Sequence, residues 1–156
     1  MSHCLNVVLF EPEIPQNTGN IGRSCVALGA KLWLVKPLGF QLDSSRLKRS
    51  GMDYWQDLDW EAVDSLDHLW KHLEPRRVWL FTKFGTQNYC DANFEFGDTL
   101  IFGSESNGLP QSLHDRFEAN RLLIPMPGPV RCLNLATSAG IVMYEAARQM
   151  ALFRGN

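Results

Sequence analysis

Amide, glycine and arginine residues gather in one short segment near the start of the chain. Asn17, Gly19, Gly22 and Arg23 stand close together, shortly after an apolar run at residues 5–10. Glycines permit backbone conformations closed to other residues, and a helix that starts here offers free N–H groups to an anion. The planar guanidinium of Arg23 suits phosphate oxygens. The segment is therefore a candidate phosphate contact, although an ordinary strand-to-helix turn with a surface arginine explains the same residues.

Two further polar loops follow apolar runs. Lys83-Phe84-Gly85-Thr86 comes after residues 78–82, and the segment FGSESNGLP, residues 102–110, places Glu105 inside a loop. The second loop lacks the Lys-Ser/Thr ending of a phosphate-binding P-loop, so the sequence disfavours an ATPase. A single glycine-rich turn of this kind is weak evidence for any one function.

The segment IPMPGPVRCLN, residues 124–134, is the most informative loop. Pro125, Pro127 and Pro129 exclude a helix and a central strand, because proline lacks the N–H that both require. Backbone groups left unpaired in such a loop need partners, and the edge of a flat ligand is one candidate. The small residues at 136–140 then allow another backbone to approach, within the fold or across a dimer. Ordinary helix packing explains them equally well.

Other catalytic patterns are missing from the sequence. It contains neither the G-x-S-x-G elbow of serine hydrolases nor the G-x-G-x-x-G fingerprint of dinucleotide-binding proteins. The four cysteines form no C-x-x-C pair, and His68 and His72 lack the neighbouring glutamate of a zinc-protease helix. We therefore expect neither a metal site nor a disulfide.

The charge balance does not by itself indicate a nucleic-acid-binding protein. The formal net charge is −2, whereas such proteins usually carry a net positive field. A local basic patch is compatible with this value, and the run that contains Arg46, Lys48 and Arg49 is the main candidate. Such runs are also common on ordinary protein surfaces.

Apolar runs and helix-compatible segments alternate along the chain. We predict strands at 5–10, 31–35, 78–82, 99–103 and 121–125. We predict helices at about 21–28, 44–50 and 65–73, a short one after Pro110, and a long one from about 133. This alternation predicts an α/β protein with a parallel sheet covered by helices on both faces. Ligands of such sheets bind beyond the carboxyl ends of the strands, where the polar segments stand.

Length and composition are those of one globular domain, which we expect to span residues 1–156. No apolar run is long enough to cross a bilayer. The first residues lack the basic flank and cleavage site of a signal peptide. We therefore expect a cytoplasmic protein.

Three of these segments, in order and at matching distances, resemble the signature motifs of the SPOUT methyltransferases. NTGNIGR (17–23) is similar to the first motif, FGSESNGLP to the second and IPMPGPVRCLNLATSAGIVMYE (124–145) to the third. The stretches VVLFEPEIPQNTGNIGR and KPLGFQLDSSRLKRSGMDYW narrow the resemblance to the small branch that methylates the wobble-nucleotide ribose of leucine transfer RNAs. The resemblance covers essentially the whole chain. It implies a deep C-terminal trefoil knot, a homodimer and S-adenosylmethionine as methyl donor.

The resemblance also assigns site residues by position. The donor-contacting positions correspond to Phe81, Gly103, Ile124 and Cys132, with Thr82, Met126 and Leu133 nearby. The polar active-site positions correspond to Asn17, Arg23, Glu105 and Asn134, and Tyr144 matches a tyrosine of the closing helix. Many relatives have serine where Cys132 stands, so a side-chain hydroxyl is absent at that position.

The implied reaction is attack of a ribose 2′-oxygen on the methyl of a sulfonium. The electrophile is already activated, so the enzyme needs alignment and removal of the hydroxyl proton, and no metal. We expect Arg23 to hold the adjacent phosphate and stabilise the developing alkoxide. Asn17 and Asn134 are expected to position the ribose.

Transfer RNA is the implied partner, and the basic run is the expected RNA contact. Tyr54 and Trp55 follow this run and are candidates to stack on a splayed base, although core packing is the more ordinary fate of at least one. Three alternatives stay open. They are methylation of ribosomal RNA or of another transfer RNA position, a non-catalytic RNA-binding protein with the same fold, and a flavodoxin-like nucleotide-binding module. The last leaves residues 124–134 unexplained.

Overall fold

A single sheet of seven parallel strands forms the centre of the molecule. The computed structural model describes residues 2–42 and 53–154. The strands are β1 (Leu5–Phe10), β2 (Lys31–Val35), β3 (Trp60–Val63), β4 (Val78–Phe81), β5 (Gln87–Asn88), β6 (Asp98–Phe102) and β7 (Arg121–Leu123). Their spatial order is β3-β2-β1-β6-β4-β7-β5. Because every pairing is parallel, the carboxyl ends of all the strands lie at one edge.

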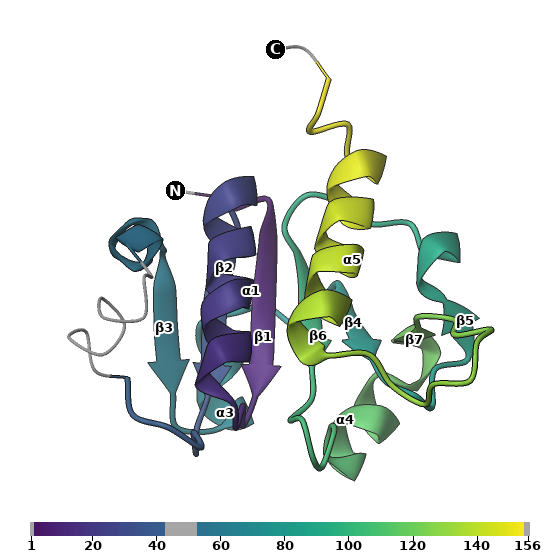
Figure 1. Ribbon diagram of the computed structural model, residues 1–156, viewed down its shortest axis with the longest axis horizontal. Helices are drawn as coiled ribbons and strands as arrows, with labels where there is room; N and C mark the ends of the chain where they lie inside the picture. Colours follow the sequence, from purple (N-terminus) through teal and green to yellow (C-terminus); the bar gives the residue numbers. More distant parts are fainter. Residues whose placement is uncertain (1, 43–52, 155–156) are drawn as a thin grey trace.

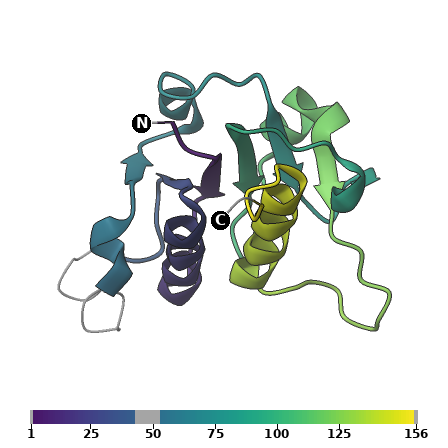
Figure 2. The same ribbon diagram turned by 90° about the horizontal axis from the view of Figure 1, so that it is seen from above.

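Helices cover both faces of this sheet, as the sequence predicted. The helices α1 (Pro15–Leu28) and α5 (Leu135–Gln149) lie side by side on one face (Figures 1 and 2). The short helices α3 (Leu66–Leu69) and α4 (Gln111–Arg116) pack on the other, and the 3₁₀ turns are η1 (Asp53–Asp57), η2 (Tyr89–Asp91) and η3 (Glu118–Asn120). Within the described ranges, no helix has the length and apolar character needed to cross a membrane.

The central strands divide their side chains between two apolar cores. Val7 and Leu9 of β1 face the core beneath α1 and α5, whereas Val8 faces the core beneath α3 and α4. Successive residues of a strand point to opposite faces, so a strand buried on both sides must be apolar throughout. β1, β2 and β6 were recognisable in the sequence for this reason, and all three lie within one residue of the predicted bounds.

The prediction for the start of α1 was wrong. The helix begins at Pro15, six residues before the expected start at Ile21. Proline suits the first helical position, because its φ is preset and its missing N–H has no partner there in any case. Consequently Asn17 and Gly19 belong to the helix and not to an open anion-binding turn. Gly22 is required by packing, since a Cβ there would lie 2.9 Å from the Trp55 ring.

Several smaller elements also differ from the sequence prediction. β3 and the two-residue β5 were not predicted, because short edge strands are defined by their pairing with β2 and β7 more than by their own residues. The expected helix at 65–73 is α-helical only over Leu66–Leu69 and continues as turns. The expected helix at 44–50 lies outside the described residues.

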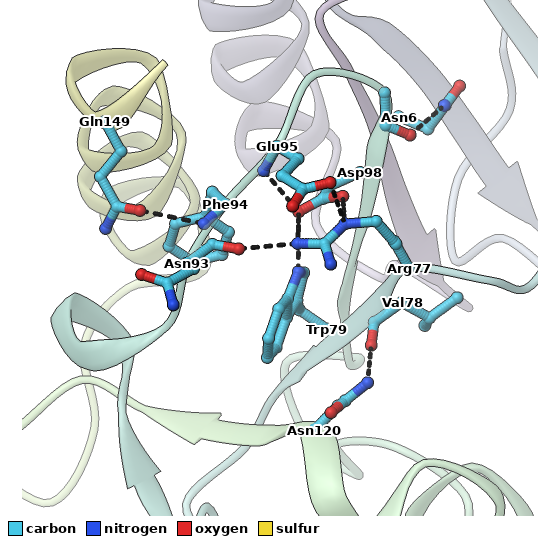
Figure 3. Close-up of polar contacts among 11 residues, drawn as sticks. Asn6, Arg77, Val78, Trp79, Asn93, Phe94, Glu95, Asp98, Asn120 and Gln149 are labelled. Carbon is cyan, nitrogen blue, oxygen red and sulfur yellow. Dashed lines mark hydrogen bonds and ion pairs between the residues drawn. The ribbon is translucent and has the colours of Figure 1, made fainter. Parts of the chain in front are cut away.

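A buried carboxylate closes the amino edge of the sheet. Asp98 is fully buried and accepts hydrogen bonds from Arg77 Nε at 2.5 Å, from Trp79 Nε1 at 2.9 Å and from the backbone N–H of Glu95 at 2.9 Å (Figure 3). Arg77 also donates to the carbonyl of Asn93 at 2.7 Å. These bonds fix the chain that precedes β6 against β4. None of these contacts was predicted from the sequence.

We expect Asp98→Ala to lower the free energy of unfolding by about 3 kcal/mol, because the donors of Arg77, Trp79 and Glu95 lose their acceptor and the partly buried Arg77 charge loses its partner. Glu95→Ala is the matched control. It removes an exposed carboxylate 3.3 Å from the same guanidinium and is expected to cost less than about 1 kcal/mol. Urea unfolding measures both, and equal losses would contradict the assignment of the stabilisation to Asp98.

Candidate functional site

Three loops that carry predicted donor-binding residues leave neighbouring strands at the carboxyl edge. Phe81 at the end of β4 is paired with Phe102 of β6 on one side and with Leu122 of β7 on the other. The backbone N–H of Thr82 donates to the carbonyl of Leu122 at 3.0 Å. The loops that begin at Thr82, Gly103 and Ile124 therefore start side by side.

Glycine is required in two of these loops because backbones approach closely. A Cβ on Gly103 would lie 2.3 Å from the carbonyl carbon of Gly108, since residues 104 and 108 form a small antiparallel bridge. A Cβ on Gly85 would lie 2.4 Å from the carbonyl carbon of Leu122. Gly108 itself has φ 65°, which favours glycine. The loops are thus folded tightly against themselves and against β7.

The third loop leaves its own polar groups free. No backbone hydrogen bond joins residues 125–133 to the rest of the described chain. Cys132 is exposed, whereas Met126 and Leu133 are half-buried. The loop therefore offers N–H and C=O groups to a ligand or to water, as the proline pattern predicted.

Glu105 connects the loop after β6 to the start of α1. Its carboxylate accepts hydrogen bonds from the backbone N–H of Glu13 at 2.9 Å and of Ile14 at 2.8 Å. It also accepts one from the side-chain amide of Asn17 at 3.2 Å. A negative charge is favourable at a helix N-terminus, where unpaired N–H groups concentrate positive potential. Glu105 therefore holds the first turn of α1 and sets the orientation of the Asn17 amide.

Asn17 and Asn134 join the starts of the two long helices. The Asn134 side-chain amide donates to Asn17 Oδ1 at 2.9 Å. Its own Oδ1 accepts from the N–H of Thr137 at 3.1 Å and so caps α5. Both helices begin at the edge where the strands end (Figure 1). Glu105, Asn17 and Asn134 thus form a continuous chain of polar contacts, which we call the amide–carboxylate bridge.

A second link between the same loops was missed by the sequence analysis. The Glu13 carboxylate accepts hydrogen bonds from the N–H of Ser106 at 3.0 Å and from its hydroxyl. These bonds lower the pKa of Glu13. Nothing in the sequence marked the pair, because 93 residues separate the two positions. Glu13 and Ser106 hold the loops after β1 and β6 against each other.

Arg23 and Tyr144 lie apart from the amide–carboxylate bridge. Arg23 is exposed on α1, and its guanidinium lies 4.8 Å from the centroid of the Tyr54 ring in η1. η1 is on the far side of α1 from α5 and from β6, β4 and β7 (Figure 1). Tyr144 is 46% exposed on α5 and stacks on Phe153, with 5.7 Å between ring centroids. Within the described residues, no hydrogen bond or ion pair joins either side chain to the amide–carboxylate bridge.

The remaining sequence candidates have different outcomes. Arg46, Lys48 and Arg49 lie outside the described residues. Trp55 is buried in the core beneath α1, so it is not a free stacking platform. Across residues 2–42 and 53–154, no three His, Cys, Asp or Glu residues gather as metal ligands.

The chain matches the family described as SpoU rRNA Methylase family over residues 4–144. It therefore belongs to the SpoU methylase family, which confirms the resemblance drawn from the three motifs. A relative from Saccharophagus degradans, named tRNA (cytidine(34)-2'-O)-methyltransferase, is 43% identical over 148 residues. The match covers 93% of this chain and 95% of that protein.

Solved structures show the same architecture. A structure that concerns the 2-OH methylation of C/U34 on tRNA is 49% identical, with a TM-score of 0.88, and the match covers 94% of this chain and 96% of that chain. The SpoU methyltransferase AviRb from Streptomyces viridochromogenes, in complex with the cofactor AdoMet, is 26% identical with a TM-score of 0.83. That match covers 100% of this chain and 60% of that one.

We expect Glu105→Gln to lower the free energy of unfolding by about 2 kcal/mol, although the change is nearly isosteric. A carboxamide places N–H donors against N–H donors, which leaves N–H groups of the partly buried first turn unpaired. Glu13→Gln is the matched control. The Ser106 hydroxyl can reverse its role and accept, so we expect a loss below about 1 kcal/mol. Urea unfolding of both variants compares them, and a larger loss for Glu13→Gln would contradict this account.

Proposed function

We propose that this protein transfers a methyl group from S-adenosylmethionine to the ribose 2′-hydroxyl of the wobble nucleotide of transfer RNA, in the cytoplasm. The observation that carries the proposal is the near full-length match to a relative named for this reaction, on a fold whose polar residues meet at the carboxyl edge. The family description mentions ribosomal RNA. Transfer RNA is favoured because the 43% and 49% identical proteins are both named for it.

The three neighbouring loops after β6, β4 and β7 fit a methyl donor. Gly103 and Gly85 let neighbouring backbones pack closely, and residues 125–133 leave peptide groups without backbone partners in the described structure. We infer that Phe81, Thr82, Gly103 and Ile124 line one side of the donor site, with Met126, Cys132 and Leu133 on the other. The bound donor supplies a sulfonium methyl group that is already electrophilic.

The polar residues of this chain align the ribose in the proposed reaction. The 2′-oxygen would attack the methyl carbon as the carbon–sulfur bond breaks, so that S-adenosylhomocysteine leaves as a neutral thioether and the hydroxyl proton passes to water. The amide–carboxylate bridge holds Asn17 and Asn134 where they can orient the ribose, because each amide is fixed by its own partners. Guanidinium groups remain protonated in proteins, so Arg23 acts by holding a phosphate and stabilising the alkoxide.

A homodimer would bring Arg23 and Tyr144 to the site. In one chain Arg23 lies over the Tyr54 ring of η1, and η1 is on the far side of α1 from α5 and from β6, β4 and β7 (Figure 1). Tyr144 and Phe153 form an exposed aromatic pair on α5, and Ile14 is 43% exposed beside the start of α1. A Cβ on Gly140 would meet nothing within 4 Å in its own chain. We infer that α1 and α5 pack against a second copy, which places Arg23 of one copy at the donor loops of the other.

The strand order supports the proposed trefoil knot. β7 lies between β4 and β5, although it follows both in the chain. The connection from β4 to β5 therefore spans β7 and bonds to it through Thr82 and Thr86. We infer that the chain passes under this connection when it leaves β7 for α5.

Mass mapping of transfer RNA from cells that lack this protein tests the function. The expected result is loss of one ribose methyl at the wobble nucleotide of particular transfer RNAs, restored by the unaltered gene. An unchanged map, or a methyl lost from ribosomal RNA, would overturn the proposed substrate.

Arg23→Lys should lose most methyl transfer while donor binding persists. Lysine keeps the charge but not the planar fork that pairs with two phosphate oxygens. A transfer assay with labelled donor measures turnover, and calorimetry with S-adenosylmethionine measures affinity. If donor affinity falls together with turnover, the assignment of Arg23 to the RNA is wrong.

A further inference from the structure

Tyr54 contacts both the side chain and the backbone environment of Arg23. Its ring lies beneath the Arg23 guanidinium, with 4.8 Å from Cζ to the ring centroid. Its hydroxyl donates to the carbonyl of Gly19 at 2.5 Å. In an α-helix this carbonyl also accepts from the N–H four residues further on, which is that of Arg23. Tyr54 therefore contacts the guanidinium of Arg23 with its ring, and its hydroxyl bonds to the helical turn that contains the Arg23 backbone.

The position of Tyr54 is itself fixed by packing. η1 lies against α1, and Trp55 is buried against Gly22, where a Cβ would come within 2.9 Å of its ring. The Tyr54 ring is half-buried. Burial raises the pKa of its hydroxyl, and the nearby Arg23 charge partly offsets this rise. Tyr54 is therefore uncharged, and packing fixes the position of its ring beneath the Arg23 guanidinium.

Among the described residues, no carboxylate forms an ion pair with Arg23. Arg77, Arg121 and Arg148 each pair with a carboxylate, but no ion pair to Arg23 is formed by the residues of the described ranges. A carboxylate partner would compete with a phosphate for the guanidinium N–H groups. An aromatic face attracts the cation while leaving those in-plane donors free.

We propose that Tyr54 is a positioning residue for the methyl transfer, which holds the Arg23 guanidinium in the orientation that meets the RNA. This inference rests on the proposed function and on the role of Arg23 within it. A free arginine side chain samples many rotamers, and restricting them before RNA binds lowers the cost of reaching the reactive geometry. Arg23 occupies one face of the Tyr54 ring, so a base cannot stack on that face.

Single-turnover methyl transfer to a full-length transfer RNA transcript tests the inference. Tyr54→Leu removes the ring and is expected to lower the rate on the order of 10-fold, the effect of losing a partly desolvated cation–π contact. Tyr54→Phe keeps the ring and should retain most of the rate. Trp70→Leu is the matched control, because Trp70 lies 5.1 Å beneath Arg116 on the opposite face of the sheet. We expect it to leave the rate unchanged.

A double-mutant cycle separates positioning from a purely structural role. In an Arg23→Gln background, Tyr54→Leu should change the remaining rate by less than about 2-fold, because the cation it supports is gone. Donor affinity, measured by calorimetry, should be the same for Tyr54→Leu as for the unaltered protein. An equal loss in both backgrounds, or a loss of donor affinity, would overturn the inference.

Two outcomes distinguish this inference from the proposed function. If the unaltered protein transfers no methyl group to the transcript, both are overturned. If it does, and Arg23→Gln impairs transfer while Tyr54→Leu does not, only the role of Tyr54 is overturned. Should Tyr54→Leu fail to fold, Tyr54→Met replaces it as the variant without an aromatic face, and equal rates for Met and Phe would overturn the inference.

Discussion

The arrangement of the candidate site depends on the hydrogen bonds that the Glu105 carboxylate accepts at the start of α1. This carboxylate accepts three N–H donors from a segment that is 88 to 92 residues away in sequence. A helix N-terminus gathers positive potential, so a carboxylate placed there is stabilised and in turn orders the first turn. Because Asn17 belongs to that turn and contacts Asn134, one charge organises residues from three separate segments. Each amide then has a fixed orientation before any substrate binds, which is what alignment of a ribose requires.

The parallel sheet explains why these segments meet. Strand ends at one edge place the loops after β1, β4, β6 and β7 next to each other, and the two long helices begin there (Figure 1). The loops after β4 and β6 are folded tightly, whereas the loop after β7 leaves peptide groups without backbone partners in the described structure. The starts of the two long helices place Asn17 against Asn134. Arg23 is directed elsewhere and rests on Tyr54. Under the proposed function, a second copy of the chain would bring Arg23 to these loops.

Sequence reasoning worked where burial dictates residue type. β1 and β2 were predicted with correct bounds, because strands covered on both faces must be apolar. The predicted start of α1 was wrong, because the preference of proline for the first helical turn was not applied to Pro15. The contacts of Glu105 with Asn17 and of Glu13 with Ser106 join distant positions that no spacing rule connects. The resemblance to known proteins, and not the hydrophobic periodicity, assigned Asn17 and Glu105 to the active site. Neither approach predicted the hydrogen bonds of Asp98 with Arg77 and Trp79.

The most direct test of ribose methylation at this edge of the sheet uses an RNA that lacks the 2′-oxygen proposed to be attacked. Labelled methyl transfer from S-adenosylmethionine is measured to a transfer RNA with a single 2′-deoxy substitution at the wobble nucleotide, and to one with the substitution at the preceding nucleotide. We predict no incorporation into the first and normal incorporation into the second. Equal incorporation into both would show that the methyl group goes to another atom, and would contradict the account of this site.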